Sequence, residues 1–292
     1  MPVRFEPSGP LRGSLRPPSD KSISHRAALI AAMGEGVTTI DGYLDAADTH
    51  STLAAVEALG AGVASADGLR PELRIEGVGL RGPRPAAIDV GNAGTLLRLL
   101  PGWLAGQEIG EWTLDGDDSI RKRPVDRIAA PLREMGASLS AREDRLPPLR
   151  ITAAPLHGIT YELPIASAQV KSCLLFAGLL AEGDTAVVES HPSRDHTERM
   201  LAAAGAEVGN DAGTVTIKPA ARLEPGEIAV PADISSAAFF VVAALLVGGS
   251  DVVLEEVGVN PTRTGLLSIL ERMGAAIETE PISERGGEPT AR

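Results

Sequence analysis

The sequence predicts an α/β protein, of the α+β kind, assembled from repeated βαβαββ units, and two series of related segments predict it. In the first series, four segments begin with a small polar residue, continue as an Ala/Leu-rich helix and end at glycine: residues 22–34, 92–106, 167–178 and 235–248. Their first residues are 70, 75 and 68 positions apart. A near-constant spacing of this kind is typical of a repeated supersecondary unit.

The second series is in phase with the first and consists of helical patterns that end in Gly-Ala. The glycines are Gly60, Gly136, Gly205 and Gly274. Glycine at such a position adopts the left-handed conformation that ends a helix, because it has no Cβ to clash. Short strand-like stretches follow, such as residues 149–152 and 214–217.

Each unit is therefore predicted to contain a strand, a helix, a strand, a helix and two short strands. Three copies are expected to be complete, at about 20–90, 91–165 and 166–230. The fourth is expected to begin near Pro231 and to stop after its second helix, because the polar tail 283–292 shows no closing strands. Repeat arrays ordinarily end in an atypical cap, and the sequence shows none.

The composition is that of a globular protein with an acidic surface. The 292 residues carry 27 Lys and Arg against 39 Asp and Glu, for a formal charge of −12. This balance argues against a nucleic-acid-binding protein and leaves open a small anion in a local basic pocket. The longest apolar run, residues 237–247, is too short to span a bilayer, which takes about 20 residues, so we expect a buried core helix there.

The single cysteine, Cys173, excludes an internal disulfide and a zinc cluster of cysteines. The five histidines do not have metal-ligand spacing, so no metal is expected. The first residues contain no apolar stretch of the signal-peptide kind. Together these features predict a protein of a reducing compartment, the cytoplasm.

Polar residues gather at the starts of the first-series helices, where free N–H groups and the helix dipole favour anions. They are Lys21, Ser22 and Arg26 in the first unit, Asn92, Gly94 and Thr95 in the second, and Ser167, Gln169 and Lys171 in the third. Cations also precede two second-series helices, at 121–123 and at Arg194 beside Ser193. Because a cation at a helix start opposes the dipole, a bound anion would explain its presence.

Each of these signals has a simpler alternative. Ser22, Ser167 and Ser235 are good helix N-caps. The segment 91–95 can be a turn followed by a cap, and the basic segment 121–123 can be a solvated face. These alternatives do not explain why cations recur at equivalent positions of the units.

Five motifs together resemble one enzyme family. They are Pro18-Ser-Asp-Lys-Ser-Ile-Ser-His-Arg26, Gly91-Asn-Ala-Gly-Thr95, Arg121-Lys-Arg-Pro124, Ser167-Ala-Gln-Val-Lys-Ser172 and Ser193-Arg-Asp-His-Thr-Glu198. In this order, the chain is similar over its whole length to the 5-enolpyruvylshikimate-3-phosphate synthase (3-phosphoshikimate 1-carboxyvinyltransferase) family. The resemblance implies the enolpyruvyl transferase fold, with two domains of three units each. Mapped here, residues 20–230 would form a complete domain, and 1–19 with 231–292 would form part of a second, discontinuous one.

The resemblance also implies a reaction and residue roles. The family transfers the enolpyruvyl group of phosphoenolpyruvate to the 5-hydroxyl of shikimate 3-phosphate and releases phosphate, on the route to chorismate and the aromatic amino acids, without metal or organic cofactor. By resemblance, Lys21 contacts both substrates and is a proton-transfer candidate, and Gln169 touches both. Ser22, Arg26, Ser167 and Ser193 would hold shikimate 3-phosphate, whereas Gly94 and Arg123 would bind phosphoenolpyruvate. Asn92, Thr95 and Arg194 are further candidates, and Ala168 stands where some members have a second serine.

In the family, an aspartate general base and several cations come from a C-terminal half that has no counterpart in these 292 residues. We therefore expect a monomer that carries the shikimate 3-phosphate half-site, turns over slowly on its own and exposes apolar residues such as Phe239, Phe240 and Leu245. Two alternatives stay open: a non-catalytic anion-binding fragment, and a partial subunit completed by a second chain.

Overall fold

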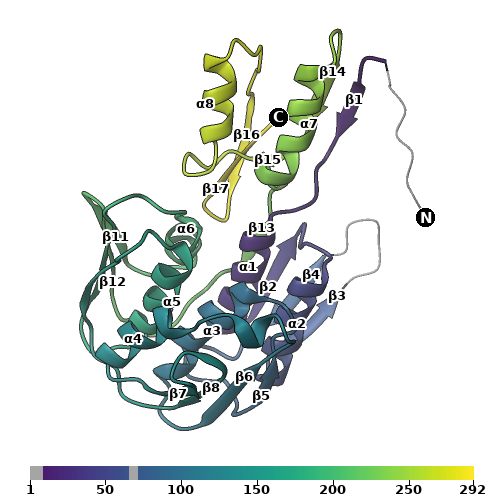
Figure 1. Ribbon diagram of the computed structural model, residues 1–292. Helices are drawn as coiled ribbons and strands as arrows, with labels where there is room; N and C mark the ends of the chain where they lie inside the picture. Colours follow the sequence, from purple (N-terminus) through teal and green to yellow (C-terminus); the bar gives the residue numbers. More distant parts are fainter. Residues whose placement is uncertain (1–8, 66–71) are drawn as a thin grey trace.

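A computed structural model of the chain describes residues 9–65 and 72–292. The first eight residues of the predicted segment 1–19 therefore lie outside the described residues. Figure 1 shows the α1–α6 region at one end of the molecule and α7, α8 and β1 at the other. Within the described residues, no helix is both long and apolar enough to cross a membrane.

Three four-stranded sheets repeat one topology, in which the strands lie in the order first, second, fourth and third. The first two strands of each sheet are parallel, and the last two join as antiparallel partners. The second unit contains β5 (Ala87–Asp89), α3 (Gly94–Ala105), β6 (Glu111–Asp115), η1 (Ile120–Lys122), α4 (Asp126–Glu134), β7 (Ser138–Arg142) and β8 (Leu146–Thr152). The third contains β9 (Thr160–Glu162), α5 (Ala168–Gly178), β10 (Thr185–Val188), α6 (His196–Ala203), β11 (Val208–Asp211) and β12 (Thr214–Ile217).

The first unit takes its first strand from a distant part of the chain. It contains α1 (Lys21–Met33), β2 (Val37–Asp41), α2 (Ala47–Ala58), β3 (Gly62–Ser65) and β4 (Leu73–Glu76), and β13 (Glu227–Ala229) occupies the first-strand position beside β2. The prediction that residues 20–90 hold a complete unit was therefore wrong. The other predicted boundaries began at the helices and so missed β5 and β9, because three-residue strands leave little pattern in a sequence.

The first helices of the three units pack together and form the centre of the hydrophobic core. Most side chains of α1, α3 and α5 are buried on every side, including Trp103 and Phe176. Cys173 lies on α5 and is fully buried, as its place in an apolar helix predicts. Gly102 of α3 lies so close to α5 that a Cβ there would be 2.0 Å from the Cys173 carbonyl oxygen. The small residues of these helices thus permit the close packing that a nearly non-aromatic core requires.

The structure confirms the predicted glycines at the helix C-termini, whereas the caps at two helix N-termini differ from the prediction. The four glycines of the second series follow the second helices with φ between 91° and 108°, which confirms their role as C-terminal glycines. Ser167 caps α5 as the N-cap alternative predicts. Ser22 and Ser235 are not caps, because Asp20 and Asp233 accept the free N–H groups of α1 and α7 instead.

The fourth segment corrects two further predictions. It contains α7 (Ile234–Leu246), β14 (Asp251–Leu254), β15 (Val257–Gly258), α8 (Gly265–Arg272), β16 (Pro281–Arg285) and β17 (Glu288–Ala291). Closing strands do exist, because β16 and β17 form an antiparallel hairpin across Gly286 and Gly287. Both glycines have positive φ, as a two-residue hairpin turn demands, and this signal was overlooked in a polar tail.

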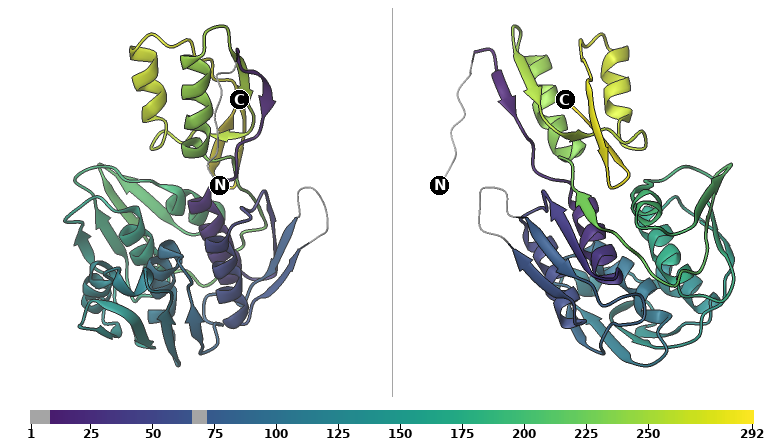
Figure 2. Two further views of the ribbon diagram at one scale, coloured as in Figure 1. Left: turned by 45° about the vertical axis from the view of Figure 1, so that its right-hand side comes forward. Right: turned by 180° about the vertical axis from the view of Figure 1, so that it is seen from behind.

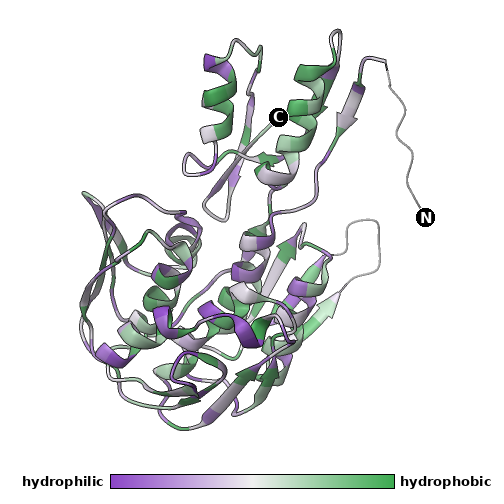
Figure 3. Cartoon of the chain, viewed as in Figure 1, coloured by the Kyte–Doolittle hydropathy of each residue, from purple (hydrophilic) through white to green (hydrophobic). Residues whose placement is uncertain are grey.

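The apolar run of α7 is not a buried core helix in this structure. Only Ile234 and Ala237 of α7 are buried, and Phe239 is 79% exposed. Phe240 and Leu245 are also exposed, which confirms the expected apolar surface. Figure 3 shows α7 as hydrophobic along most of its length.

Two antiparallel segments connect the two ends of the molecule. The N-terminal strand β1 (Arg12–Leu15) lies parallel to β14, and the chain then crosses to α1. The return segment passes from β13 to α7, and the two crossings pair through the bridge between Ser19 and Ala232. Figure 2 shows both crossings side by side from two directions. Whether the ranges 20–230 and 1–19 with 231–292 act as two domains stays a prediction.

The buried His25 of α1 makes stability depend on pH. Burial, followed by nearby Arg26 and Lys21, lowers the pKa of His25 from 6.5 to about 4 against the opposing effect of Asp48. Between these values the unfolded chain binds a proton that the folded chain does not, so the free energy of unfolding falls as pH falls from 6.5 towards 4. From pH 7 to pH 5 the loss attributable to His25 is expected to be about 2 kcal/mol. Urea unfolding at both pH values checks this: His25→Gln should reduce the pH dependence by that amount, whereas exposed His191→Gln should leave it unchanged.

Candidate active site

The start of α1 presents a cation and a hydroxyl above a buried guanidinium. Lys21 is exposed and its Nζ lies 2.9 Å from Asp48 Oδ2 at the start of α2. Arg26 is 2% exposed and donates to Ser172 Oγ, at 2.9 Å, and to Thr197 Oγ1, at 2.6 Å. Arg26 therefore ties α1 to both α5 and α6, and burial lowers its pKa to about 10, so it stays charged at neutral pH.

The start of α3 meets the side chain of Arg123. A Cβ at Gly94 would lie 2.6 Å from Arg123 Nη1, so the absent side chain leaves room for the guanidinium. Arg123 Nη2 also donates to Asn92 Oδ1 at 2.6 Å. Of the segment 91–95, residues 91–92 form the turn that the simpler alternative predicts, with Gly91 at φ 56°, whereas the N-cap residue Ala93 makes no side-chain cap bond and Gly94 begins α3. The positive end of the α3 dipole and the Arg123 guanidinium therefore lie side by side.

Sequence reasoning missed Arg98, which adds a second guanidinium at the start of α3. Its Nη1 donates to the Gly94 carbonyl oxygen at 3.1 Å. Burial lowers the pKa of Arg98, and the charges of Arg123 and Arg127 lower it further, so three guanidinium groups repel one another here. The signal was available, because Arg98 is four residues after Gly94 and so lies on the same helix face. A bound anion would relieve this repulsion.

At the start of α5, one predicted residue joins the cluster and another does not. Gln169 Nε2 lies 3.2 Å from Thr95 Oγ1 of α3. Ser167 Oγ accepts from Val170 N as the helix cap. Lys171 was predicted to face an anion, and this was wrong: it is 1% exposed and lies 2.6 Å from both Glu189 and Glu198. Its position two residues after Gln169 turns it to the interior of the α5–α6 packing.

The segment before α6 reaches across to α1. Arg194 Nη1 donates to Ser22 Oγ at 3.2 Å, which links two predicted residues that are 172 positions apart. Ser193 Oγ is buried without a hydrogen-bond partner among the described residues. A buried hydroxyl in this state is costly unless a ligand or water satisfies it.

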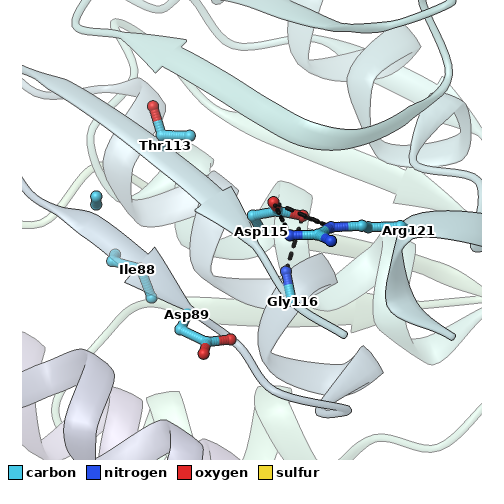
Figure 4. Close-up of a pocket in the computed structure, with 7 residues that line it drawn as sticks. Ile88, Asp89, Thr113, Asp115, Gly116 and Arg121 are labelled. Atoms are coloured by element: carbon cyan, nitrogen blue, oxygen red, sulfur yellow. Dashed lines mark hydrogen bonds and ion pairs between the residues drawn. The ribbon is translucent and has the colours of Figure 1, made fainter. Parts of the chain in front are cut away.

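The basic segment 121–123 divides between two environments. Arg121 lies 2.9 Å from Asp115 Oδ2, beside a shallow pocket of about 320 Å³ at the ends of β5 and β6. Figure 4 shows the Arg121 side chain pointing towards Asp115, with dashed lines between their charged groups. Arg121 and Lys122 are exposed, as the solvated-face alternative predicts. Of the three basic residues, Arg123 alone joins the cluster at Gly94.

Contacts link the predicted residues into one continuous set. Arg194 contacts Ser22, and Arg26 of the same helix bonds to Ser172 of α5, the helix that carries Gln169. Gln169 then contacts Thr95, beside the Gly94–Arg123 pair. Lys21 is joined to this set through Asp48 of α2, whose Ser51 lies next to Gly91. The N-termini of α1, α3 and α5 therefore meet in one region of the molecule, with several cations among them.

The fold and this cluster define a class of protein built from βαβαββ units in which the N-termini of several helices, and cations beside them, meet in one region. The sequence model of EPSP synthase (3-phosphoshikimate 1-carboxyvinyltransferase) matches residues 5–290, and the chain belongs to this family. This confirms the resemblance that the five motifs suggested.

Curated relatives and solved structures agree with this membership. The chain is 51% identical over 288 residues, 98% of its length, to the 3-phosphoshikimate 1-carboxyvinyltransferase of Methylococcus capsulatus. It is 50% identical over 295 residues to that of Alkalilimnicola ehrlichii. EPSP synthase from Acinetobacter baumannii superposes with a TM-score of 0.91 over 98% of this chain at 45% identity, and 64% of that chain is covered. The chain spans 65% of the length of the curated relatives it matches.

Proposed function

We propose that this chain takes part in the transfer of the enolpyruvyl group from phosphoenolpyruvate to the 5-hydroxyl of shikimate 3-phosphate, with release of phosphate, in the route to chorismate. The observation that supports this most is the joining of all five family motifs around the N-termini of α1, α3, α5 and α6. The two substrates carry phosphates and carboxylates, and such a set of N–H groups and guanidinium groups suits them.

Shikimate 3-phosphate is assigned to the side of the cluster formed by α1, α5 and α6. Ser22 and Arg194 already bond to each other there and can both turn a donor towards a phosphate. The Ser193 hydroxyl, which has no partner among the described residues, supplies another donor. Each of the three guanidinium nitrogens of Arg26 donates to a protein oxygen, so its role is to hold α1 in place and to add positive charge. Ser167 caps α5 and stands at the same edge.

Phosphoenolpyruvate is assigned to the α3 side. Arg123 and Arg98 flank the first turn of α3, and the absence of a side chain at Gly94 leaves room for both guanidinium groups beside it. Asn92 and Thr95 orient Arg123 and Gln169, respectively. Lys21 would contact both substrates and give the proton that adds to the methylene carbon of phosphoenolpyruvate. In the same step the 5-hydroxyl oxygen would bond to C2 and lose its own proton to water. In the second step the C–O bond to phosphate breaks, the former methylene carbon loses a proton to the departing phosphate, and the C=C bond forms again.

Calorimetric titration of shikimate 3-phosphate into the purified chain tests the assignment. Saturable binding of one molecule per chain is expected. Shikimate without its phosphate should bind at least about tenfold more weakly, because it loses charge-assisted hydrogen bonds. Equal affinity for the two compounds, or the absence of binding at millimolar concentration, would contradict the proposal.

Gly94→Ala is expected to weaken phosphoenolpyruvate binding without unfolding the chain. The added methyl group would meet the ends of the Arg123 and Arg98 side chains, which can move away, so the free energy of unfolding should change by less than about 1 kcal/mol. The displaced guanidinium groups should lower the affinity for phosphoenolpyruvate, measured with saturating shikimate 3-phosphate, by about tenfold. Gly209→Ala is the control, because a Cβ there meets nothing within 4 Å. Unchanged affinity in Gly94→Ala would remove phosphoenolpyruvate from this end of α3.

We also propose that the chain is a monomer in the cytoplasm. Sedimentation velocity tests the first part, and a mass corresponding to a dimer at micromolar concentration would contradict it.

A further inference from the structure

The turn formed by residues 260–263 contacts the starts of three helices. Asn260 Oδ1 accepts from Thr262 N at 2.9 Å and from Thr262 Oγ1 at 2.7 Å, and Arg263 N donates to the Asn260 carbonyl oxygen at 2.8 Å. These bonds fix the conformation of the turn, from which the Asn260 and Arg263 side chains reach different helices. The turn belongs to the end of the molecule that holds α7 and α8, whereas the candidate site lies on α1–α6 (Figure 1).

Asn260 binds the first turn of α6. Its side chain is 2% exposed, and its Nδ2 donates to Asp195 Oδ1 at 2.6 Å and to Glu288 Oε2 at 3.2 Å. Glu288 in turn lies 2.7 Å from His196 Nδ1. Asp195 and His196 immediately follow Ser193 and Arg194, the two candidate ligands of this segment. A buried amide that holds Asp195 therefore fixes the backbone from which Arg194 extends.

Arg263 binds the caps of α1 and α7. Its Nη1 lies 3.7 Å from Asp20 Oδ2, and its Nη2 lies 3.4 Å from Asp233 Oδ1 and 2.5 Å from Ser235 Oγ. Asp20 caps the helix that presents Lys21 and Ser22. Without Arg263, two largely buried carboxylates would face each other beside the point where an anion is to bind. Burial and the charge of Asp233 both raise the pKa of Asp20, whereas Arg263 lowers it.

We propose that Asn260 and Arg263 are positioning residues, which hold the first turns of α6 and α1 at the separation at which Arg194 and Ser22 act on one phosphate. This inference rests on the proposed function, because it concerns the shape and charge of the shikimate 3-phosphate side of the site. It adds residues from the α7–α8 end of the molecule to a site whose candidate ligands all lie between residues 21 and 194. Neither residue touches the substrate in this arrangement.

Four variants of the full chain distinguish the positioning of the helix starts by the turn from the effect of the Arg263 charge. Asn260→Ala removes the side-chain bonds to Asp195, Glu288 and Thr262 without changing any charge. Arg263→Gln removes the cation between Asp20 and Asp233, and Arg263→Lys restores the charge without the planar fork that reaches both carboxylates. Arg272→Gln, at the exposed end of α8, is the matched control. Circular dichroism and urea unfolding establish that each variant is folded.

Amide hydrogen exchange of the ligand-free chain is the first measurement, and it does not depend on the substrate. Asn260→Ala should accelerate exchange at 194–199 by about tenfold or more and leave the β5–β8 sheet unchanged, because every side-chain bond of Asn260 goes either to Asp195 at the α6 start or to Thr262 and Glu288 at the α7–α8 end. Arg263→Gln should do the same at 21–24. Wild-type exchange in these segments, or an equal acceleration over the whole chain, would overturn the proposal, since the second result indicates general destabilisation.

The affinity for shikimate 3-phosphate is the second measurement. It should fall by about fivefold in Asn260→Ala and by at least about tenfold in Arg263→Gln, with partial recovery in Arg263→Lys and no change in Arg272→Gln. Faster local exchange with unchanged affinity would overturn the link to the site. If the wild-type chain does not bind shikimate 3-phosphate, the proposed function fails, and the exchange result still reports whether the turn holds α1 and α6.

Discussion

Replacing Gly102 with alanine is expected to destabilise the chain by about 3 kcal/mol or more. The new Cβ would lie 2.0 Å from the Cys173 carbonyl oxygen and 2.9 Å from its carbonyl carbon. Both atoms belong to the backbone of α5, which is buried on every side and cannot move locally. The helices α3 and α5 would therefore have to separate along their length, and the aliphatic side chains between them would lose contact.

The sign of the effect makes the test decisive. In a helix without neighbours, alanine is more favourable than glycine by about 1 kcal/mol. Gly265→Ala in α8 is the matched control, because a Cβ there meets nothing within 4 Å, and a small stabilisation is expected. Urea unfolding of both variants measures the difference. A Gly102→Ala variant as stable as the wild type would show that α3 and α5 do not pack this closely.

This packing also bears on the candidate site. The contact between Thr95 and Gln169 joins the first turns of the same two helices, at 3.2 Å. Because helices are stiff, a separation of α3 from α5 at Gly102 would also move the first turns of these two helices apart. A folded Gly102→Ala variant is therefore expected to bind both substrates more weakly than the wild type.

The sequence was sufficient to predict the features that depend on local pattern. The helices of the first series appear close to their predicted bounds, and those of the second series end beside their predicted glycines. An apolar helical stretch and a terminal glycine are both encoded within about 15 neighbouring residues. The left-handed glycines, including Gly60 and Gly274, follow from the same local requirement. The candidate residues at the helix starts were found for this reason, and the family motifs then joined them into one hypothesis.

The features that depend on distant partners could not be predicted in this way. The strand β13 completes the sheet of a unit that begins some 200 residues earlier. The sequence of a three-residue strand does not specify the strand with which it pairs. Asp20 and Ser22 are both good caps, and the choice between them depends on where the crossing segment enters α1. The inward orientation of Lys171 depends on Glu189 and Glu198, which belong to other elements.

Lys171→Met is the second change with a large expected effect, about 3–5 kcal/mol of destabilisation. Lys171 Nζ donates to Glu189 Oε2 at 2.6 Å, and the side chains of Glu189 and Glu198 are 6% and 8% exposed. The contact with Glu198, also 2.6 Å, is an ion pair without hydrogen-bond alignment, so both carboxylate oxygens of Glu198 have no hydrogen-bond donor among the described residues. The methionine side chain has a similar length and carries no charge. The substitution therefore leaves the buried carboxylates of Glu189 and Glu198 without the cation that both contact.

The pH dependence of the Lys171→Met variant identifies the cause. Burial raises the pKa of Glu198, and the charge of Lys171 opposes that rise. Without Lys171 the rise increases, and a carboxyl with a raised pKa in the folded state makes folding less favourable as pH rises through that range. The loss of stability relative to wild type should therefore be smaller at pH 5 than at pH 8. Urea unfolding at both pH values measures it, and a loss that does not change with pH would indicate altered packing instead.

A triple variant separates the loss of the cation from the loss of the side chain. Replacing Lys171, Glu189 and Glu198 together by methionine removes the buried charges as a set, and such replacements in other proteins are often neutral. At least about half of the stability lost in Lys171→Met should return. The negative charge of Glu198 favours the charged form of nearby Arg26, and the triple variant loses this interaction, so the recovery of stability is expected to be incomplete. A triple variant less stable than Lys171→Met would contradict this explanation. It would show that the carboxylates make stabilising interactions of their own, and that their mutual repulsion is not the cause of the destabilisation.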